Sequence, residues 1–119
     1  MAGANVVYRV MTVDDIPMVQ LVERKCFTTP WSRNIFVSEV TRNDNAIYFV
    51  ALVGERIVGY AGIWIILDEG HITNIAVDPA FQRQGIGEGL IDELTKAAVR
   101  RGVIAMTLEV RVSNTGAQA

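Results

Sequence analysis

The chain has 119 residues, enough for one domain with a buried core and too few for two, so we expect residues 1–119 to form a single domain. Half of the residues are apolar, a fifth are charged and the formal net charge is −2, so no overall basic field attracts nucleic acid. The single cysteine, Cys26, excludes an intrachain disulfide and indicates a reducing, cytoplasmic environment. No apolar run is long enough to span a bilayer, and the N-terminus lacks the pattern of a signal peptide.

The first part of the chain predicts a strand followed by two helices. Residues 6–11 alternate as a short strand, and the Thr-x-Asp-Asp sequence after them is typical of a helix start. Apolar residues recur at helical spacing over residues 16–27, and Pro30 ends this helix. Trp31 and Ser32 then lead into a predicted second helix that carries Ile35, Phe36, Glu39 and Val40.

The middle of the chain predicts an antiparallel meander of strands. Residues 46–53 and 56–67 are rich in Val, Ile, Tyr and Trp, and the Gly-Glu pair between them suits a two-residue hairpin turn. Residues 68–70 predict the next turn, and residues 71–77 predict the strand that follows it.

The last third predicts a helix and a further strand. Apolar residues occupy one face over residues 85–101, which end in a cationic last turn and a glycine cap. Residues 103–112 predict a strand parallel to the one before the helix, because a strand, a crossover helix and a strand form a parallel pair. The expected fold is therefore α/β with a mixed sheet, in which an antiparallel meander is joined to a parallel strand–helix–strand unit.

A loop rich in backbone donors joins the meander to the long helix. Gly85 and Gly87 let a ligand approach the amides closely, the helix dipole favours an anion there, and Arg83 adds a positive charge. A phosphate or pyrophosphate is the expected ligand, although a plain strand-to-helix turn has the same Gly-x-Gly pattern. The Walker motif does not fit because Glu88 follows Gly87, and the dinucleotide fingerprint is weakened because Leu90 replaces its third glycine.

Several motifs of the chain resemble one enzyme family. The hexapeptide QRQGIG at residues 82–87 resembles the Q/R-x-x-G-x-G/A signature of the GNAT superfamily, the acetyl-CoA-dependent N-acetyltransferases. The segments NIAVDP at 74–79, PWS at 30–32 and LEVR at 108–111, followed by Ser-Asn, resemble the bacterial ribosomal-protein alanine N-acetyltransferases. The resemblance covers nearly all of the chain in the same order, and it implies a GNAT-like fold.

The resemblance also implies acetyl-CoA as the cofactor and assigns residues to it. The implied cofactor-binding residues are Ile75, Ala76, Val77, Arg83, Gln84, Gly85, Ile86, Gly87 and Asn114. The first three would pair through their backbone with the pantetheine arm, as an added strand does, and the asparagine would lie beside that arm. The other five would hold the pyrophosphate through backbone amides.

The implied reaction is direct attack of a neutral amine on the acetyl thioester in a ternary complex, without an acetyl-enzyme. The resemblance makes Glu109 the general base, whereas the residue pattern alone describes an ordinary solvated glutamate. An amide near Val77 would stabilise the oxyanion. No metal site is expected, because His71 has no Cys or His cluster nearby. The implied acceptor-binding residues are Phe27, Pro30 and Trp31.

The subfamily supplies a tyrosine as general acid from a helix after the Ser-Asn motif, and the sequence ends before it. We therefore expect a C-terminally truncated part of a longer enzyme that lacks the last helix and strands, is weakly active or inactive, and self-associates through the exposed edge strand at 103–112. The implied function is acetylation of a protein N-terminus, with an alanine of a ribosomal or other protein as acceptor. Alternatives are a GNAT enzyme for a small amine or lysine, a CoA-binding module without turnover and, disfavoured, a nucleotide-binding protein.

Overall fold

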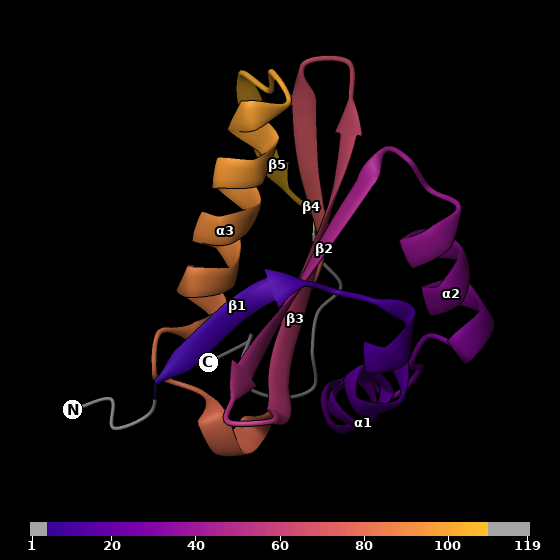
Figure 1. Cartoon of the computed structure of the whole chain (residues 1–119), viewed down its shortest axis with the longest axis vertical. Coiled ribbons are helices and arrows are strands. Elements are labelled where there is room, and N and C mark those ends of the chain that lie inside the picture. The colour runs from indigo at the N-terminus through magenta and orange to yellow at the C-terminus, as the bar shows by residue number, and fades with distance from the viewer. Residues whose placement is uncertain (1–4, 110–119) are drawn as a thin grey trace.

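The computed structural model of the chain describes residues 5–109 as a five-stranded sheet with helices on both faces (Figure 1). Helices α1 and α2 cover one face and α3 covers the other (Figure 1). None of the helices in this part of the chain is long and apolar enough to cross a membrane. The elements are β1 (Val6–Val10), a 3-10 turn (Val13–Asp15), α1 (Ile16–Cys26), α2 (Arg33–Thr41), β2 (Ala46–Val53), β3 (Arg56–Ile66), β4 (Glu69–Val77), a second 3-10 turn (Pro79–Phe81), α3 (Ile86–Arg100) and β5 (Ala105–Leu108).

The strands lie side by side in chain order. Strands β1 to β4 pair antiparallel, and β5 pairs parallel with β4 after the crossover through α3. The meander and the parallel unit predicted from the sequence are therefore confirmed. Strand β5 forms one edge of the sheet within the described residues, and self-association through it stays a prediction.

Two predicted strand starts were wrong by two residues. Strand β4 begins at Glu69, because the turn before it is made by Leu67 and Asp68, with Leu67 at a φ of 57°. Strand β5 begins at Ala105 because Val103 is still bound to the last turn of α3, where its amide donates to the Ala98 carbonyl at 3.1 Å. The last three residues of the predicted strand, 110–112, lie outside the described residues.

Apolar side chains fill the two layers between the sheet and its helices. On the α1 and α2 face, the rings of Phe36 and Tyr60 are fully buried and meet edge to face with centroids 5.6 Å apart. On the α3 face, Leu90 and Leu94 are fully buried against the sheet. Burial of each such side chain contributes about 1.5–3 kcal/mol, so both layers stabilise the fold.

Strand β4 carries an extra residue where it parts from β5. The pairing of β3 with β4 shifts between Gly62 and Ile63, which leaves Thr73 unpaired in β4. The pairing of β4 with β5 ends at Ile72, directly before this bulge. A bulge bends a strand and increases its twist. Residues 73–77 consequently have no strand partner on their outer side among the described residues.

Candidate active site

The C-terminal end of β4 presents backbone groups on its outer side. The Asp78 amide donates to the Val58 carbonyl on β3 at 2.7 Å, so the carbonyl of the same peptide unit, that of Val77, points away from β3. This carbonyl accepts hydrogen bonds from Gln82 Nε2 at 3.1 Å and from Cys26 Sγ at 3.3 Å. In an antiparallel strand the N–H and C=O of one residue face the same side, so the Val77 amide also points outward. We expected an amide near Val77 to face an oxyanion, and that role stays a prediction.

The loop after β4 ends in a left-handed glycine that begins α3. Gly85 has a φ of 79°, and the position of its missing Cβ is open space. Arg83 also has a positive φ, 64°, and its side chain is exposed. The Gly89 amide donates to the Gly85 carbonyl as the first bond of the helix, so the amides of residues 86–88 precede the helical ladder and are available to an anion.

The glycine loop, residues 82–87, and the outer end of β4 lie next to each other. A Cβ built on Gly87 would lie 3.7 Å from Ile75 Cδ1 and 3.9 Å from Val77 Cγ2. The side chain of Ile86 is buried in the α3 layer, so only its backbone can face a ligand. The structure thus brings the two halves of the expected cofactor site together, while Asn114 lies outside the described residues.

Asp78 ties the start of this loop to α1 and β3. Its carboxylate accepts from Lys25 Nζ at 2.9 Å, from Arg56 at 3.0 Å and from the Ala80 amide at 2.9 Å. Burial raises the pKa of Asp78, but the hydrogen bonds from Lys25, Ala80 and Arg56 outweigh burial, so the pKa lies below its ordinary value. The sequence carries no local signal for this anchor, because Lys25 and Arg56 are far from Asp78 along the chain.

We expect acid to weaken the Asp78 anchor. Because folding lowers the pKa of Asp78, its contribution to the free energy of unfolding is present above the ordinary aspartate range and is lost as the pH falls through the lower, folded value. Asp78→Asn should lower the Tm at neutral pH and flatten the fall of Tm as the pH drops below the ordinary aspartate pKa of about 3.9. Thermal unfolding from neutral pH downward measures both. Asp92→Asn, which removes an exposed pair with Lys96, is the control, and identical curves for the two variants would contradict the prediction.

The expected general base, Glu109, directly follows β5. Its amide donates to the Ile72 carbonyl at 2.9 Å, and its side chain is 73% exposed. His71 on β4 lies beside it, with Nδ1 3.5 Å from Glu109 Oε1. His71 is paired with Trp64 on β3, whose Nε1 donates to Glu39 of α2 at 2.7 Å. Glu109 and His71 therefore lie on the sheet face that α1 and α2 cover.

The expected acceptor residues lie on the same face, in the segment that joins α1 to α2. Phe27 is buried in the core, Pro30 is exposed, and Trp31 is half-buried with its ring 5.4 Å from that of Phe36. Of the three, only Pro30 and Trp31 offer side-chain surface to an acceptor. Ser32 begins α2, and its hydroxyl accepts from the Ile35 amide at 3.3 Å.

A buried carboxylate that we did not predict holds this segment in place. Glu23 is fully buried in α1, its Oε2 accepts from the Trp31 amide at 2.8 Å, and its Oε1 accepts from the Tyr60 hydroxyl on β3. The sequence contains a signal for it, because Glu23 comes four residues after Val19 in the apolar stripe of α1. A charged group in a buried stripe requires polar partners.

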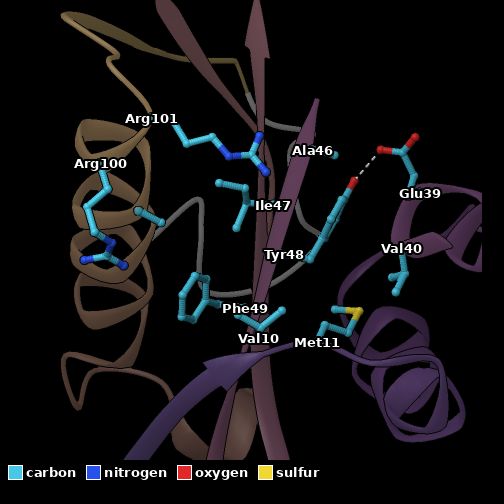
Figure 2. Close-up of a pocket in the computed structure, with 11 residues that line it drawn as sticks. Val10, Met11, Glu39, Val40, Ala46, Ile47, Tyr48, Phe49, Arg100 and Arg101 are labelled. Carbon is cyan, nitrogen blue, oxygen red and sulfur yellow. Dashed lines mark hydrogen bonds between the residues drawn. The ribbon is translucent and has the colours of Figure 1, made fainter. Parts of the chain in front are cut away.

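A pocket of about 370 Å³ lies beside the first half of β2, between α2 and the last turns of α3 (Figure 2). Its walls come from β1, β2, α2 and the last turns of α3, and the Tyr48 hydroxyl donates to Glu39 at 2.7 Å on one side of it (Figure 2). None of the expected site residues within 5–109 lines this pocket. Within the same residues no group of three or more His, Cys, Asp or Glu side chains could hold a metal ion.

Known proteins resemble this chain both in sequence and in fold. The model of the acetyltransferase (GNAT) family matches residues 15–119. The ribosomal protein bS18-alanine N-acetyltransferase of Escherichia coli (strain K12) is 35% identical over 105 residues, which cover 88% of this chain and 70% of that protein. A protein of Bacillus subtilis (strain 168) that is provisionally given the same name is 38% identical over 110 residues, 92% of this chain and 73% of that one.

Solved structures agree with this match. The crystal structure of the ribosomal-protein-S18-alanine N-acetyltransferase from Escherichia coli has a TM-score of 0.81 at 32% identity, over 96% of this chain and 72% of that chain. The paia N-acetyltransferase from Thermoplasma acidophilum, solved in complex with coenzyme A, has a TM-score of 0.80 at 15% identity, over 87% and 78% of the two chains. The second likeness concerns the fold alone.

Proposed function

This chain belongs to the GNAT family of acetyltransferases, and we propose that it acetylates the N-terminal amine of a ribosomal protein, with alanine as the acceptor residue and acetyl-CoA as the donor. The names of its relatives support the acceptor, since they give an alanine of ribosomal protein bS18. Ribosomal proteins are made in the cytoplasm, where we place the reaction. The observation that carries the proposal is the outer edge of β4 at residues 73–77, which has no strand partner in the described part of the chain and lies next to the glycine loop.

The proposed cofactor site uses backbone groups for most of its contacts. The outer side of residues 75–77 pairs with the amides and carbonyls of the pantetheine arm, as an added strand does. The free amides of residues 86–88 and the exposed Arg83 receive the pyrophosphate, whose charge the α3 dipole favours. The thioester would lie at the end of the arm that is farther from the glycine loop, along the outer side of β4 and toward Glu109.

The proposed chemistry needs one proton transfer before the acyl transfer. An N-terminal amine has an ordinary pKa of about 7.7–8.0, so a carboxylate that accepts its proton, directly or through one water, is a sufficient base. The neutral amine attacks the thioester carbon, an amide near Val77 stabilises the oxyanion, and the C–S bond breaks as the coenzyme A thiolate leaves. The proton that the acetylated nitrogen loses goes to this thiolate, so coenzyme A is released as the thiol. Glu109 is the proposed base, because its exposed carboxylate lies on the face that also carries Pro30 and Trp31.

Glu109→Gln should lower kcat by about 10²- to 10⁴-fold and leave acetyl-CoA affinity unchanged, since the amide cannot accept the proton. The fold should persist, because the Glu109 side chain is 73% exposed and its backbone bond to β4 remains. The assay follows thiol release from acetyl-CoA with a peptide that begins with alanine, compared with a polyamine and a peptide with lysine as its only free amine. Glu55→Gln, in the exposed hairpin turn, is the control.

Normal turnover by Glu109→Gln would contradict the assignment of the base. Faster acetylation of the polyamine or the lysine peptide than of the alanine peptide would contradict the proposed acceptor and leave the family unaffected.

A further inference from the structure

The geometry points to His71 as a proton relay: it takes from Glu109 the proton that the acceptor amine gives up and passes it to Glu69 and the solvent. This inference rests on the proposed function, since it requires Glu109 as the base. In this relay His71 is a second group that carries the proton. It also gives Glu109 a route back to its charged form.

The imidazole of His71 lies between two carboxylates, one near each nitrogen. Glu109 Oε1 is 3.5 Å from Nδ1, and Glu69 Oε1 is 3.4 Å from Nε2. The side chain of His71 is 22% exposed, whereas those of Glu69 and Glu109 are 59% and 73% exposed. The ring is therefore mostly enclosed by its neighbours, whereas both carboxylates are exposed to solvent.

The strand register produces this alignment. His71 is directly opposite Thr107 in the parallel pair of β4 and β5, and Thr107 Oγ1 lies 2.7 Å from His71 Nδ1. Glu69 precedes His71 by two residues on β4, and Glu109 follows Thr107 by two residues, so alternation places all four side chains on one face. Glu39, the α2 acid that faces this side, already accepts hydrogen bonds from Tyr48 and Trp64.

The contacts favour one tautomer of the neutral ring. With the proton on Nε2, the ring donates toward Glu69, and its Nδ1 lone pair accepts from the Thr107 hydroxyl at 2.7 Å. Nδ1 is then the nitrogen that can receive a proton from Glu109, once the Thr107 hydroxyl turns away from its single lone pair. The distance of 3.5 Å shortens with a small rotation of the exposed Glu109 side chain or is bridged by one water.

The proton is conserved through the steps. The amine loses one proton to Glu109, the protonated Glu109 gives it to His71 Nδ1, and Glu109 is a carboxylate again. The imidazolium that forms has one carboxylate near each nitrogen. It then loses the Nε2 proton to Glu69 or water, and exchange with solvent restores the first tautomer.

His71 is the only histidine of the chain, so ¹⁵N-labelled histidine gives NMR signals from this one ring. In neutral solution we expect the Nε2-protonated tautomer. Glu109→Gln should move the Nδ1 signal more than the Nε2 signal, and Glu69→Gln should do the reverse, because each carboxylate faces one nitrogen. A ring protonated on Nδ1, or signals that neither variant moves, would overturn the relay whether or not the chain turns over.

Activity supplies the second test. His71→Gln should lower kcat on the order of tenfold, with KM and acetyl-CoA affinity unchanged, and a high concentration of a small buffer base should restore its rate. The same buffer should not restore Glu109→Gln. A normal kcat in His71→Gln, or a loss that buffer does not restore, would overturn the relay in an active enzyme. A parent without turnover contradicts the proposed function instead, and the relay is then judged by the NMR signals.

Discussion

Gly87→Glu is expected to weaken acetyl-CoA binding by more than about 100-fold, or about 2.7 kcal/mol. A Cβ on Gly87 would lie 3.7 Å from Ile75 and 3.9 Å from Val77, so the position is already bordered by the end of β4. The rest of a glutamate side chain must extend into the proposed cofactor site. Its negative charge would stand beside the amides of residues 86–88, where the helix dipole favours the cofactor's pyrophosphate.

Calorimetric titration with acetyl-CoA measures this loss. Gly87→Ala is the matched control, because its Cβ makes only ordinary van der Waals contacts and carries no charge, so it should retain most of the affinity. Equal binding by the glutamate and alanine variants would contradict the placement of the pyrophosphate. Absence of binding by the parent chain would contradict the cofactor proposal itself.

Glu23→Ala is expected to lower the free energy of unfolding by about 2–4 kcal/mol. The substitution removes the acceptor of the Trp31 amide and of the Tyr60 hydroxyl, and it leaves a cavity in a fully buried part of α1. Glu23→Gln keeps the volume and one acceptor oxygen but turns an NH₂ group toward a donor, so its loss should be about half as large.

Denaturant unfolding of the parent chain and of the two Glu23 variants measures these differences. Glu55→Ala, in the exposed hairpin turn, is the control and should stay within about 0.5 kcal/mol of the parent. Because Glu23 holds the segment before α2, both Glu23 variants should also raise the KM for the acceptor peptide more than the Kd for acetyl-CoA. Stability of Glu23→Ala equal to that of the control would contradict the structural role.

The predicted elements were confirmed where the sequence pattern is local. Helix α3 shows this best, because its apolar stripe, its cationic last turn and its glycine start all lie within one segment of the chain. The hairpin turn between β2 and β3 and the parallel crossover to β5 followed from turn residues and element order in the same way. The errors were at strand starts, where one buried residue, Val103, continues the contacts of the helix before it.

Parts of the candidate site could not be found in this way. The bulge at Thr73, directly after the last described pair of β4 with β5, depends on how two strand pairs fit one sheet. His71 meets Thr107 across 36 positions of the chain, and Asp78 meets Lys25 across 53. The roles of Glu109 and the glycine loop as catalytic and cofactor groups stay predictions, and Asn114 lies beyond the described residues.

By itself the sequence determined the order and type of the helices and strands, the mixed sheet and the glycine loop, because helices and strands repeat every 3.6 and 2 residues and turns need particular residues. Only the tertiary structure decided that β4 has no outer strand partner beyond Ile72 within residues 5–109, that Glu23 holds the segment between α1 and α2, and that His71 lies between two carboxylates. These features depend on strand register and on burial against distant segments. Both are set by packing of the whole chain, which leaves no periodic signal in the sequence.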